Sequence, residues 1–195
     1  TVIYHDINQA LYNAPAGSTV FLPAGSFTVS DTILIKKKLT IVGVGHRSDT
    51  PCGYTQVAGN FNFMLGSDNS SLLGIYLSGN VIIANADGAV SNFTLQFCNV
   101  NSLQVGNSAC TSIIINQNYL RDVSYGGNAS IQFSNNIMHS AYGINNGFIS
   151  HNTTTYGTSN GGYYYSYPFN ATSNSTIINN ISVFNTNYGY LSGIY

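Results

Sequence analysis

Arg121 and His139 are the residues of this chain best suited to acid–base chemistry. Arg121 lies three positions after Asn118 and His139 three positions after Asn136, so the two become neighbours if these segments stack in register. A neutral imidazole can take a proton, and a nearby guanidinium can stabilise the negative charge that forms. With Asp122 beside them, they would suit the proton abstraction of a polysaccharide lyase. The simpler interpretation, which we favour, is a surface turn in which Asp122 pairs with Arg121.

Carboxylate pairs and metal ligands are scarce. A glycoside hydrolase needs two carboxylates about 5 to 9.5 Å apart. Only Asp68 and Asp87, 19 positions apart, could meet this need, and both are better explained as turn residues. The chain has no Asp-x-Asp motif and no Cys or Cys/His spacing typical of a zinc site. Calcium is thus poorly supported, and we expect no cofactor.

Tyrosines form the other chemically distinctive segment. Tyr163, Tyr164, Tyr165 and Tyr167 fall within residues 161–169. A tyrosine ring is apolar on its faces and carries a hydroxyl at its edge, which suits the mixed surface of a sugar. This segment predicts contact with a polysaccharide or a cell-surface glycan. The alternative is a loop that folds against the protein and buries its own rings.

A repeat indicates which elements carry these residues. Short apolar segments end in Asn, and the last Asn of each gives steps of 19, 18, 16 and 28 residues. Three short strands with three turns need about that length, so each step reads as one coil of a parallel β-solenoid. Stacked amides can hydrogen-bond from coil to coil as a ladder. The predicted ladder consists of Asn99, Asn118, Asn136, Asn152 and Asn180.

The N-terminal stretch predicts a helix over residues 5–14. Asp6 can cap it, Ile7, Ala10 and Leu11 form its apolar face, and Pro15 follows its end. Short strand patterns follow, and no later segment has a helical pattern. Asn-Gly and Asp-Gly hairpin turns are sparse, which disfavours a sandwich. We predict an all-β protein, a right-handed parallel β-helix with a short capping α-helix.

The predicted domain spans residues 1–195. The 28-residue step contains an inserted loop over 157–174, and the polar segment 46–54 is a second excursion that can form one wall of a groove. Residues 187–195 show no cap. We therefore expect the natural chain to continue, with further domains or self-association covering that end.

Composition narrows the function classes. Charged residues make up 6% of the 195, the net charge is −1, and the chain contains 26 Asn. Five scattered cations cannot neutralise a row of phosphates, which argues against nucleic acid. No apolar run reaches the roughly 20 residues of a membrane span. Cys52, Cys98 and Cys110 leave two states open: one disulfide with a free thiol, or three thiols.

The N-terminal third resembles a known superfamily. The apolar face of the helix, the run APAGSTVFLPAGSF at 14–27 and the run LTIVGVG at 39–45 are similar to the opening of pectate-lyase-like right-handed parallel β-helix proteins. The Asn-ended coils extend a looser likeness over most of the chain. The polar, Asn- and Tyr-rich character of 60–195 also looks like secreted surface proteins of Bacteroidetes.

This resemblance implies an extracellular, carbohydrate-related setting without implying an enzyme. Pectate lyases hold calcium with several carboxylates on neighbouring coils, a pattern that this chain lacks. We expect a secreted binding or structural module that contacts polysaccharide or a cell surface. The alternatives are a polysaccharide-degrading lyase or hydrolase, and an ice-binding or filament-forming scaffold whose flat ladders of Asn, Ser and Thr order water.

Overall fold

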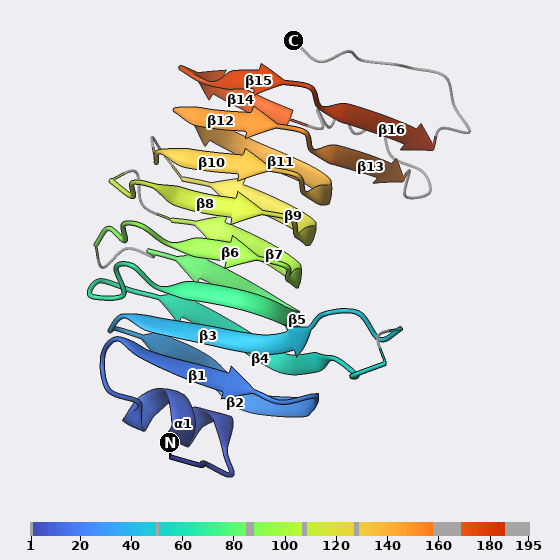
Figure 1. Cartoon of the computed structure of the whole chain (residues 1–195). Coiled ribbons are helices and arrows are strands. Elements are labelled where there is room, and N and C mark those ends of the chain that lie inside the picture. The colour runs from blue at the N-terminus through green and yellow to red at the C-terminus, as the bar shows by residue number, and fades with distance from the viewer. Residues whose placement is uncertain are drawn as a thin grey trace.

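The computed structural model describes residues 2–49, 51–84, 88–106, 109–126, 129–157 and 169–185. The chain forms a right-handed parallel β-helix with one α-helix at its N-terminal end, as the sequence predicted (Figure 1). The elements are α1 (Ile7–Asn13), β1 (Ser18–Leu22), β2 (Gly25–Ile35), β3 (Leu39–Gly45), β4 (Thr55–Phe63), β5 (Ser71–Ile83), β6 (Thr94–Gln96), β7 (Asn99–Val105), β8 (Ile113–Asn116), β9 (Tyr119–Tyr125), β10 (Ile131–Ser134), β11 (Ile137–Asn145), β12 (Gly147–Ser150), β13 (Thr153–Gly157), β14 (Phe169–Ser173), β15 (Thr176–Ile178) and β16 (Ile181–Asn185).

Two stacks of strands form opposite walls of the helix. The first wall runs β1, β3, β5, β6, β8, β10, β12, β15, and the second begins with β2, β4, β5, β7, β9, β11. β5 is long enough to turn the corner and belong to both walls. Every pairing between the described strands is parallel, whereas a sandwich built from hairpins would need antiparallel pairs.

The core consists of inward-facing files of apolar side chains. In the first wall Leu72, Leu95, Ile115, Phe133 and Ile149 lie one above another in register, and each is fully buried. Burying each such side chain contributes roughly 1.5–3 kcal/mol. The alternation of apolar and polar residues along these short strands therefore sets which wall face is inward.

A sharp corner follows each strand of the first wall from β6 to β15. Its first residue has a left-handed backbone, with φ between 53° and 57° at Phe97, Gln117, Asn135, His151 and Asn179. Asn adopts this conformation more readily than most residues. The corner therefore favours amide-rich sequences.

The second residue of the corner forms the amide ladder. Asn118 donates from Nδ2 to Oδ1 of Asn136, Asn136 to Asn152, and Asn152 to Asn180, each at 3.0 Å. Each Oδ1 also accepts the backbone N–H of the residue below, at 2.8–3.0 Å. Asn118, Asn136 and Asn152 are at least 97% buried, so the ladder satisfies polar groups that could not reach water.

The predicted first member, Asn99, is not part of this ladder. The Oδ1 of Asn118 accepts instead from the backbone N–H of Cys98, at 2.9 Å, while Asn99 pairs with Tyr119 and faces outward. The Cys98 thiol lies 3.3 Å from the Gln96 carbonyl oxygen, as the Asn118 amide lies near that of Asn116. A one-residue shift reverses the face of a side chain in a strand, which is why counting by the final Asn failed here.

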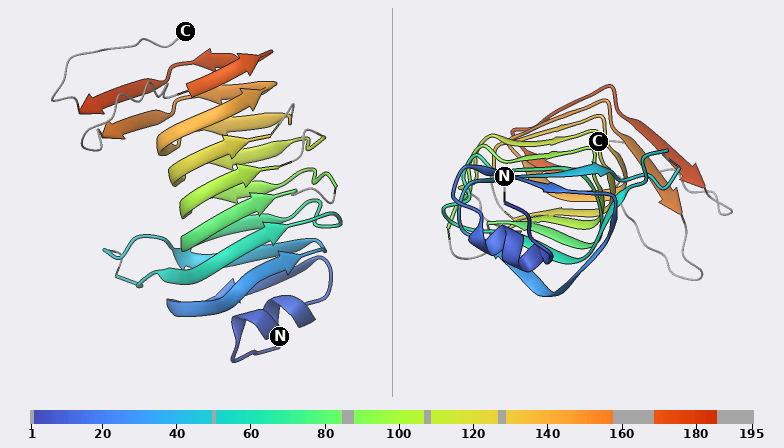
Figure 2. Two further views of the ribbon diagram at one scale, coloured as in Figure 1. Left: turned by 180° about the vertical axis from the view of Figure 1, so that it is seen from behind. Right: turned by 60° about the horizontal axis from the view of Figure 1, so that its bottom comes forward.

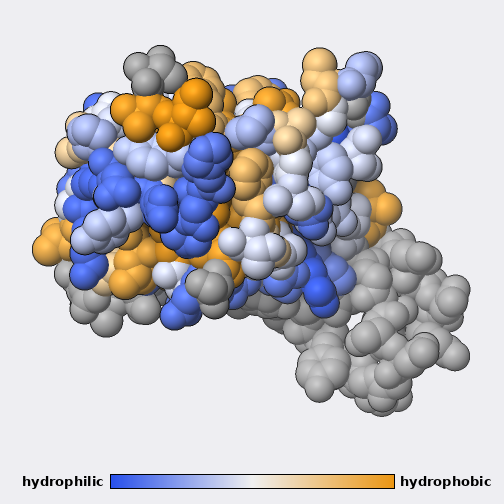
Figure 3. All heavy atoms as spheres, turned by 90° about the horizontal axis from the view of Figure 1, so that it is seen from below, coloured by the Kyte–Doolittle hydropathy of each residue, from blue (hydrophilic) through white to orange (hydrophobic). Residues whose placement is uncertain are grey.

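Helix α1 covers the N-terminal end of the core (Figure 2). Asp6 caps it by accepting the backbone N–H of Gln9 at 2.9 Å, and Ile7, Ala10 and Leu11 are buried. Lys37 donates from Nζ to the carbonyl oxygen of helix residue 12 and ties the helix to the first coil. Seen from below, this end shows mainly hydrophilic side chains with hydrophobic ones toward its margin (Figure 3).

The predicted insertion over 157–174 is wrong at its C-terminal boundary. Residues 169–173 form β14, which pairs with β11, so the coil resumes before residue 174. β13 pairs with β16, and these two strands extend away from the stack (Figure 2). Residues 158–168 and the predicted uncovered end, 187–195, lie outside the described residues.

Candidate functional site

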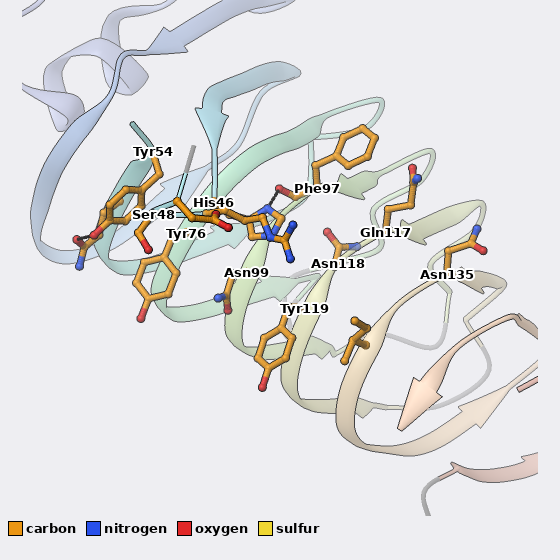
Figure 4. A pocket seen from close by; sticks show the side chains of 14 residues that line it. His46, Ser48, Tyr54, Tyr76, Phe97, Asn99, Gln117, Asn118, Tyr119 and Asn135 are labelled. Atoms are coloured by element: carbon orange, nitrogen blue, oxygen red, sulfur yellow. Dashed lines mark hydrogen bonds between the residues drawn. The ribbon is translucent and has the colours of Figure 1, made fainter. Parts of the chain in front are cut away.

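A groove of about 830 Å³ lies along the corner between the two walls (Figure 4). One side is formed by residues 46–54, which connect β3 to β4 and which we call the 46–54 loop; its residue 50 lies outside the described residues. The predicted groove wall is therefore present. The opposite side is formed by the left-handed corner residues of later coils, Phe97, Gln117 and Asn135.

The floor of the groove is a single file of residues from β4, β5, β7, β9 and β11. Gln56 pairs with Tyr76, Tyr76 with Asn99, Asn99 with Tyr119, and Tyr119 with Ile137. The side chains of Tyr76, Asn99 and Tyr119 project in the same direction (Figure 4). The β-helix thus aligns two tyrosine rings along its axis with an amide between them.

The lower end of the floor is held by contacts around Gln56. The Tyr54 hydroxyl donates to Oε1 of Gln56 at 3.1 Å, and the Ser26 hydroxyl donates to the same atom at 3.3 Å. The Tyr54 and Tyr76 rings meet edge to face, with centroids 6.2 Å apart. These contacts fix the ring orientation at this end of the groove before any ligand arrives.

His46 anchors the 46–54 loop over the corner. Its Nδ1 lies 2.6 Å from the carbonyl oxygen of Phe97, two coils further along the β-helix. A carbonyl oxygen can only accept, so Nδ1 carries the proton and Nε2 is the acceptor of the neutral ring. The contact holds the 46–54 loop against the corner.

The charges of the groove are confined to its loop side. Arg47 and Asp49 are exposed on the 46–54 loop, whereas the floor residues carry no charge. The electrostatic potentials of these two opposite charges nearly cancel at the floor of the groove. The groove therefore presents hydroxyls, amides and ring faces, with little net electrostatic potential along its floor.

The predicted catalytic trio lies beside the groove, on β9 and β11 just past the floor residues Tyr119 and Ile137. Arg121 and His139 fall between the register pairs Leu120–Met138 and Asp122–Ser140, so they occupy equivalent positions of β9 and β11. The Nε of Arg121 is 3.7 Å from Oδ2 of Asp122, with side chains 69% and 56% exposed. Such an exposed pair contributes about 0–1 kcal/mol. None of the three residues lines the groove, and their catalytic role stays a prediction.

Of the other residues predicted from the sequence, Asp68 is described by the structure and the remainder lie outside the described residues. Asp68 accepts the backbone N–H of Ser91 at 2.8 Å, which is the role of a turn residue, while Asp87 lies outside the described residues. The tyrosines predicted to bind a ligand also lie outside them: Tyr163, Tyr164, Tyr165 and Tyr167. Glycan contact by that segment stays a prediction.

All three cysteines are thiols. Cys52 is exposed on the 46–54 loop, whereas Cys98 and Cys110 are buried. Burial in the core raises the pKa of Cys98 to about 12, so its thiol is protonated and unreactive at neutral pH. Within the described ranges no group of three His, Cys, Asp or Glu side chains is placed to hold a metal ion, and no helix is long and apolar enough to cross a membrane.

The groove tyrosines Tyr76 and Tyr119 were not predicted, although the position of Tyr119 in the repeat indicates that it faces outward. Tyr119 directly follows the ladder residue Asn118, and the residue after a ladder position faces outward. Tyr76 lies before the first Asn-ended segment, so its register could not be counted.

Comparisons of the chain with protein-family models, with curated protein sequences and with solved structures gave no significant match. The parallel β-helix follows from the structure itself, while the likeness to the pectate-lyase-like superfamily stays a resemblance of the N-terminal third.

Proposed function

We propose that this protein is a secreted binding module that holds a polysaccharide or cell-surface glycan in the groove under the 46–54 loop. The observation that carries the proposal is the floor file of Tyr76, Asn99 and Tyr119, with the Tyr119 side chain 48% exposed. A sugar ring stacks its C–H face on an aromatic ring and hydrogen-bonds through its hydroxyls. This floor supplies both kinds of contact at fixed spacing.

The rigidity of the site supports binding over chemistry. Its floor residues belong to strands paired on both sides, so little conformational entropy is lost on binding. The strongest candidates for acid–base work, Arg121 and His139, are outside the groove. A preorganised, uncharged groove is suited to recognition of a hydroxyl-rich ligand.

The test is a glycan array followed by isothermal titration calorimetry on the best ligand. Wild-type protein should bind, and Tyr119→Ala should weaken binding by about tenfold, because half of a ring's burial energy is worth roughly 1.4 kcal/mol. Tyr12→Ala is the matched control, since Tyr12 is 83% exposed on α1, far from the groove. Unchanged binding in Tyr119→Ala and Tyr76→Ala would exclude the groove as the site.

A second candidate function, ordering water at an ice surface, has support from the outer face of the first wall. Thr19, Thr40, Ser71 and Thr94 form a straight file of hydroxyl-bearing residues at the strand spacing of about 4.8 Å, and Ile114 ends it. Such a file can hold waters at a regular repeat. Thermal hysteresis in wild-type protein that disappears in Thr40→Tyr, but not in Gln132→Tyr on the same face, would establish this function.

A further inference from the structure

We infer that the groove selects a neutral polysaccharide with a flat, extended backbone, and that the chain lies parallel to the β-helix axis. This inference rests on the proposed function and adds to it a ligand class and a direction. It follows from three features of the floor: the spacing of its rings, the straightness of its file and its lack of charge.

The spacing of the rings is fixed by the backbone. Tyr76 pairs with Asn99 and Asn99 with Tyr119, so the two tyrosines are separated by two strand spacings. Two spacings amount to about 10 Å. In a flat glycan joined through equatorial bonds, alternate sugars present the same face, and one disaccharide has a similar length. Tyr76 and Tyr119 can therefore stack on every second sugar of such a chain.

Asn99 then meets the sugar between the two stacked ones. Its side chain is half-buried and lines the groove between the tyrosines. An amide offers two N–H donors and one acceptor oxygen, which match the hydroxyls at the edge of a sugar ring. The alternation of ring, amide and ring along the floor thus follows the two-sugar period of a flat backbone.

The straightness of the file excludes curved chains. Gln56, Tyr76, Asn99, Tyr119 and Ile137 pair without a shift in register at these positions, so the floor follows the stacking direction. An α-1,4-linked glucan curls into a helix and would leave the floor after one ring. Ile137, 46% exposed at the far end, offers an apolar surface to a further sugar of a straight chain.

The absence of charge on the floor excludes polyanions. A uronate chain carries a carboxylate on each sugar and needs a row of cations to bind it. Among the described lining residues Arg47 is the one arginine or lysine, on the loop side and close in sequence to Asp49. Arg121, two residues past Tyr119 on β9, does not line the groove and has Asp122 beside it. A neutral chain has no charge to desolvate in such a groove, whereas a polyuronate would desolvate carboxylates without partners.

The experiment compares hexasaccharides by calorimetry on the whole chain. The neutral, flat probes are β-1,4-linked hexamers of glucose, mannose and xylose. The curved probe is maltohexaose and the charged probe is hexagalacturonate. We expect at least one flat probe to bind, with affinity that rises from the dimer to the hexamer and changes little between 50 and 500 mM salt. Tyr76→Ala and Tyr119→Ala should each reduce affinity about tenfold, while Tyr12→Ala leaves it unchanged.

The outcomes separate this inference from the proposed function. Binding of maltohexaose or hexagalacturonate as tight as that of every flat probe, and lowered by the groove variants, would keep the groove as a glycan site and overturn the ligand class. Loss of binding in Tyr119→Ala without loss in Tyr76→Ala would overturn the two-ring arrangement. Binding of no probe and of no array glycan would overturn both proposals.

Discussion

The N-terminal coils and the later coils turn the corner between the two walls in different ways. From β6 onward each corner is a left-handed residue followed by a ladder position, and Asn118, Asn136 and Asn152 repeat the same hydrogen bonds. The earlier corners lack the amide: in β5 the left-handed residue is Gly74, and buried Ile75 follows it. There the Thr55 side chain, fully buried, bonds the carbonyl oxygens of Leu22 and Pro23, at 3.1 and 3.0 Å.

A second bend of the N-terminal coils, inside β4 and β5, is built on the glycines Gly59 and Gly79. A Cβ on Gly79 would lie 1.9 Å from the carbonyl oxygen of Gly59, so the two coils approach more closely than any side chain allows. The 46–54 loop leaves at the other corner, after Gly45, which is the corner that Gly74 and Phe97 turn in later coils. The repeated ladder thus satisfies buried polar groups in the later coils, while the irregular N-terminal coils supply one wall of the groove.

The largest expected effect comes from breaking the ladder at its centre. Asn136→Leu removes the acceptor of the Asn118 backbone N–H and the donor to the Ile115 carbonyl oxygen, leaving two buried groups unpaired. At about 1–3 kcal/mol each, the free energy of unfolding should fall by about 4 kcal/mol. Chemical denaturation followed by circular dichroism measures it. Asn179→Ala, on the exposed side of the same kind of corner, is the control and should cost less than half as much.

Overpacking the irregular coils should have the next largest effect. Gly79→Ala forces apart the backbones of β4 and β5 and should lower the free energy of unfolding by about 3 kcal/mol. Gly126→Ala is the matched control in the regular coils, where the added Cβ would be 3.3 Å from its nearest atom. Equal effects of the two substitutions in urea titrations would contradict the distinction between the two regions.

Alkaline pH should weaken the junction between the regions. Burial raises the pKa of Cys98 from 9.0 to about 12, so the folded state holds a proton that the unfolded state releases above pH 9. Stability from this group is complete below pH 9 and is lost as the pH rises toward 12, by about 2 kcal/mol at pH 10.5. Burial also raises the pKa of Tyr125, which acts in the same direction. Denaturation midpoints at pH 8 and 10.5 should differ less in Cys98→Asn, which removes the thiol and retains Tyr125.

The smallest effect distinguishes the floor file of the groove, which contains Asn99, from the amide ladder. Asn99→Ala should change the free energy of unfolding by less than about 0.5 kcal/mol, because Asn99 faces the groove and not the ladder. Its glycan affinity should nevertheless fall. Asn118→Ala, one coil further along, should instead lower the free energy of unfolding, because Asn118 belongs to the buried ladder. A stability loss in Asn99→Ala equal to that of Asn118→Ala would return Asn99 to the ladder.

Much of the fold could be predicted from local patterns. The helix over Ile7–Asn13, the coil repeat and the stacked positions of Asn118, Asn136, Asn152 and Asn180 follow from capping, periodicity and spacing. Asn99 was misplaced by one residue because Cys98, which is not an amide, takes its ladder position. β14 was missed because the 28-residue step offered no Asn-ended marker within it.

The candidate site was less accessible to sequence reasoning. Arg121 and His139 were brought to equivalent positions as the repeat implied, but they lie two residues past the floor residues Tyr119 and Ile137 and do not line the groove. The groove itself combines the 46–54 loop with residues as distant as Asn135 and Ile137, four coils away. No local pattern reports that a loop leaving one coil is pinned by His46 to the carbonyl oxygen of Phe97.

By itself the sequence determined the type of structure. Alternating apolar residues, amides at coil spacing and few charges together fit a stacked parallel β-helix. In that structure equivalent residues of successive coils lie about 4.8 Å apart, which favours stacked amides and apolar side chains and disfavours stacked like charges. Only the tertiary structure decided which tyrosines share a surface. Their alignment depends on coil lengths that vary between 16 and 31 residues, and a difference of one residue moves a side chain from the groove to the core.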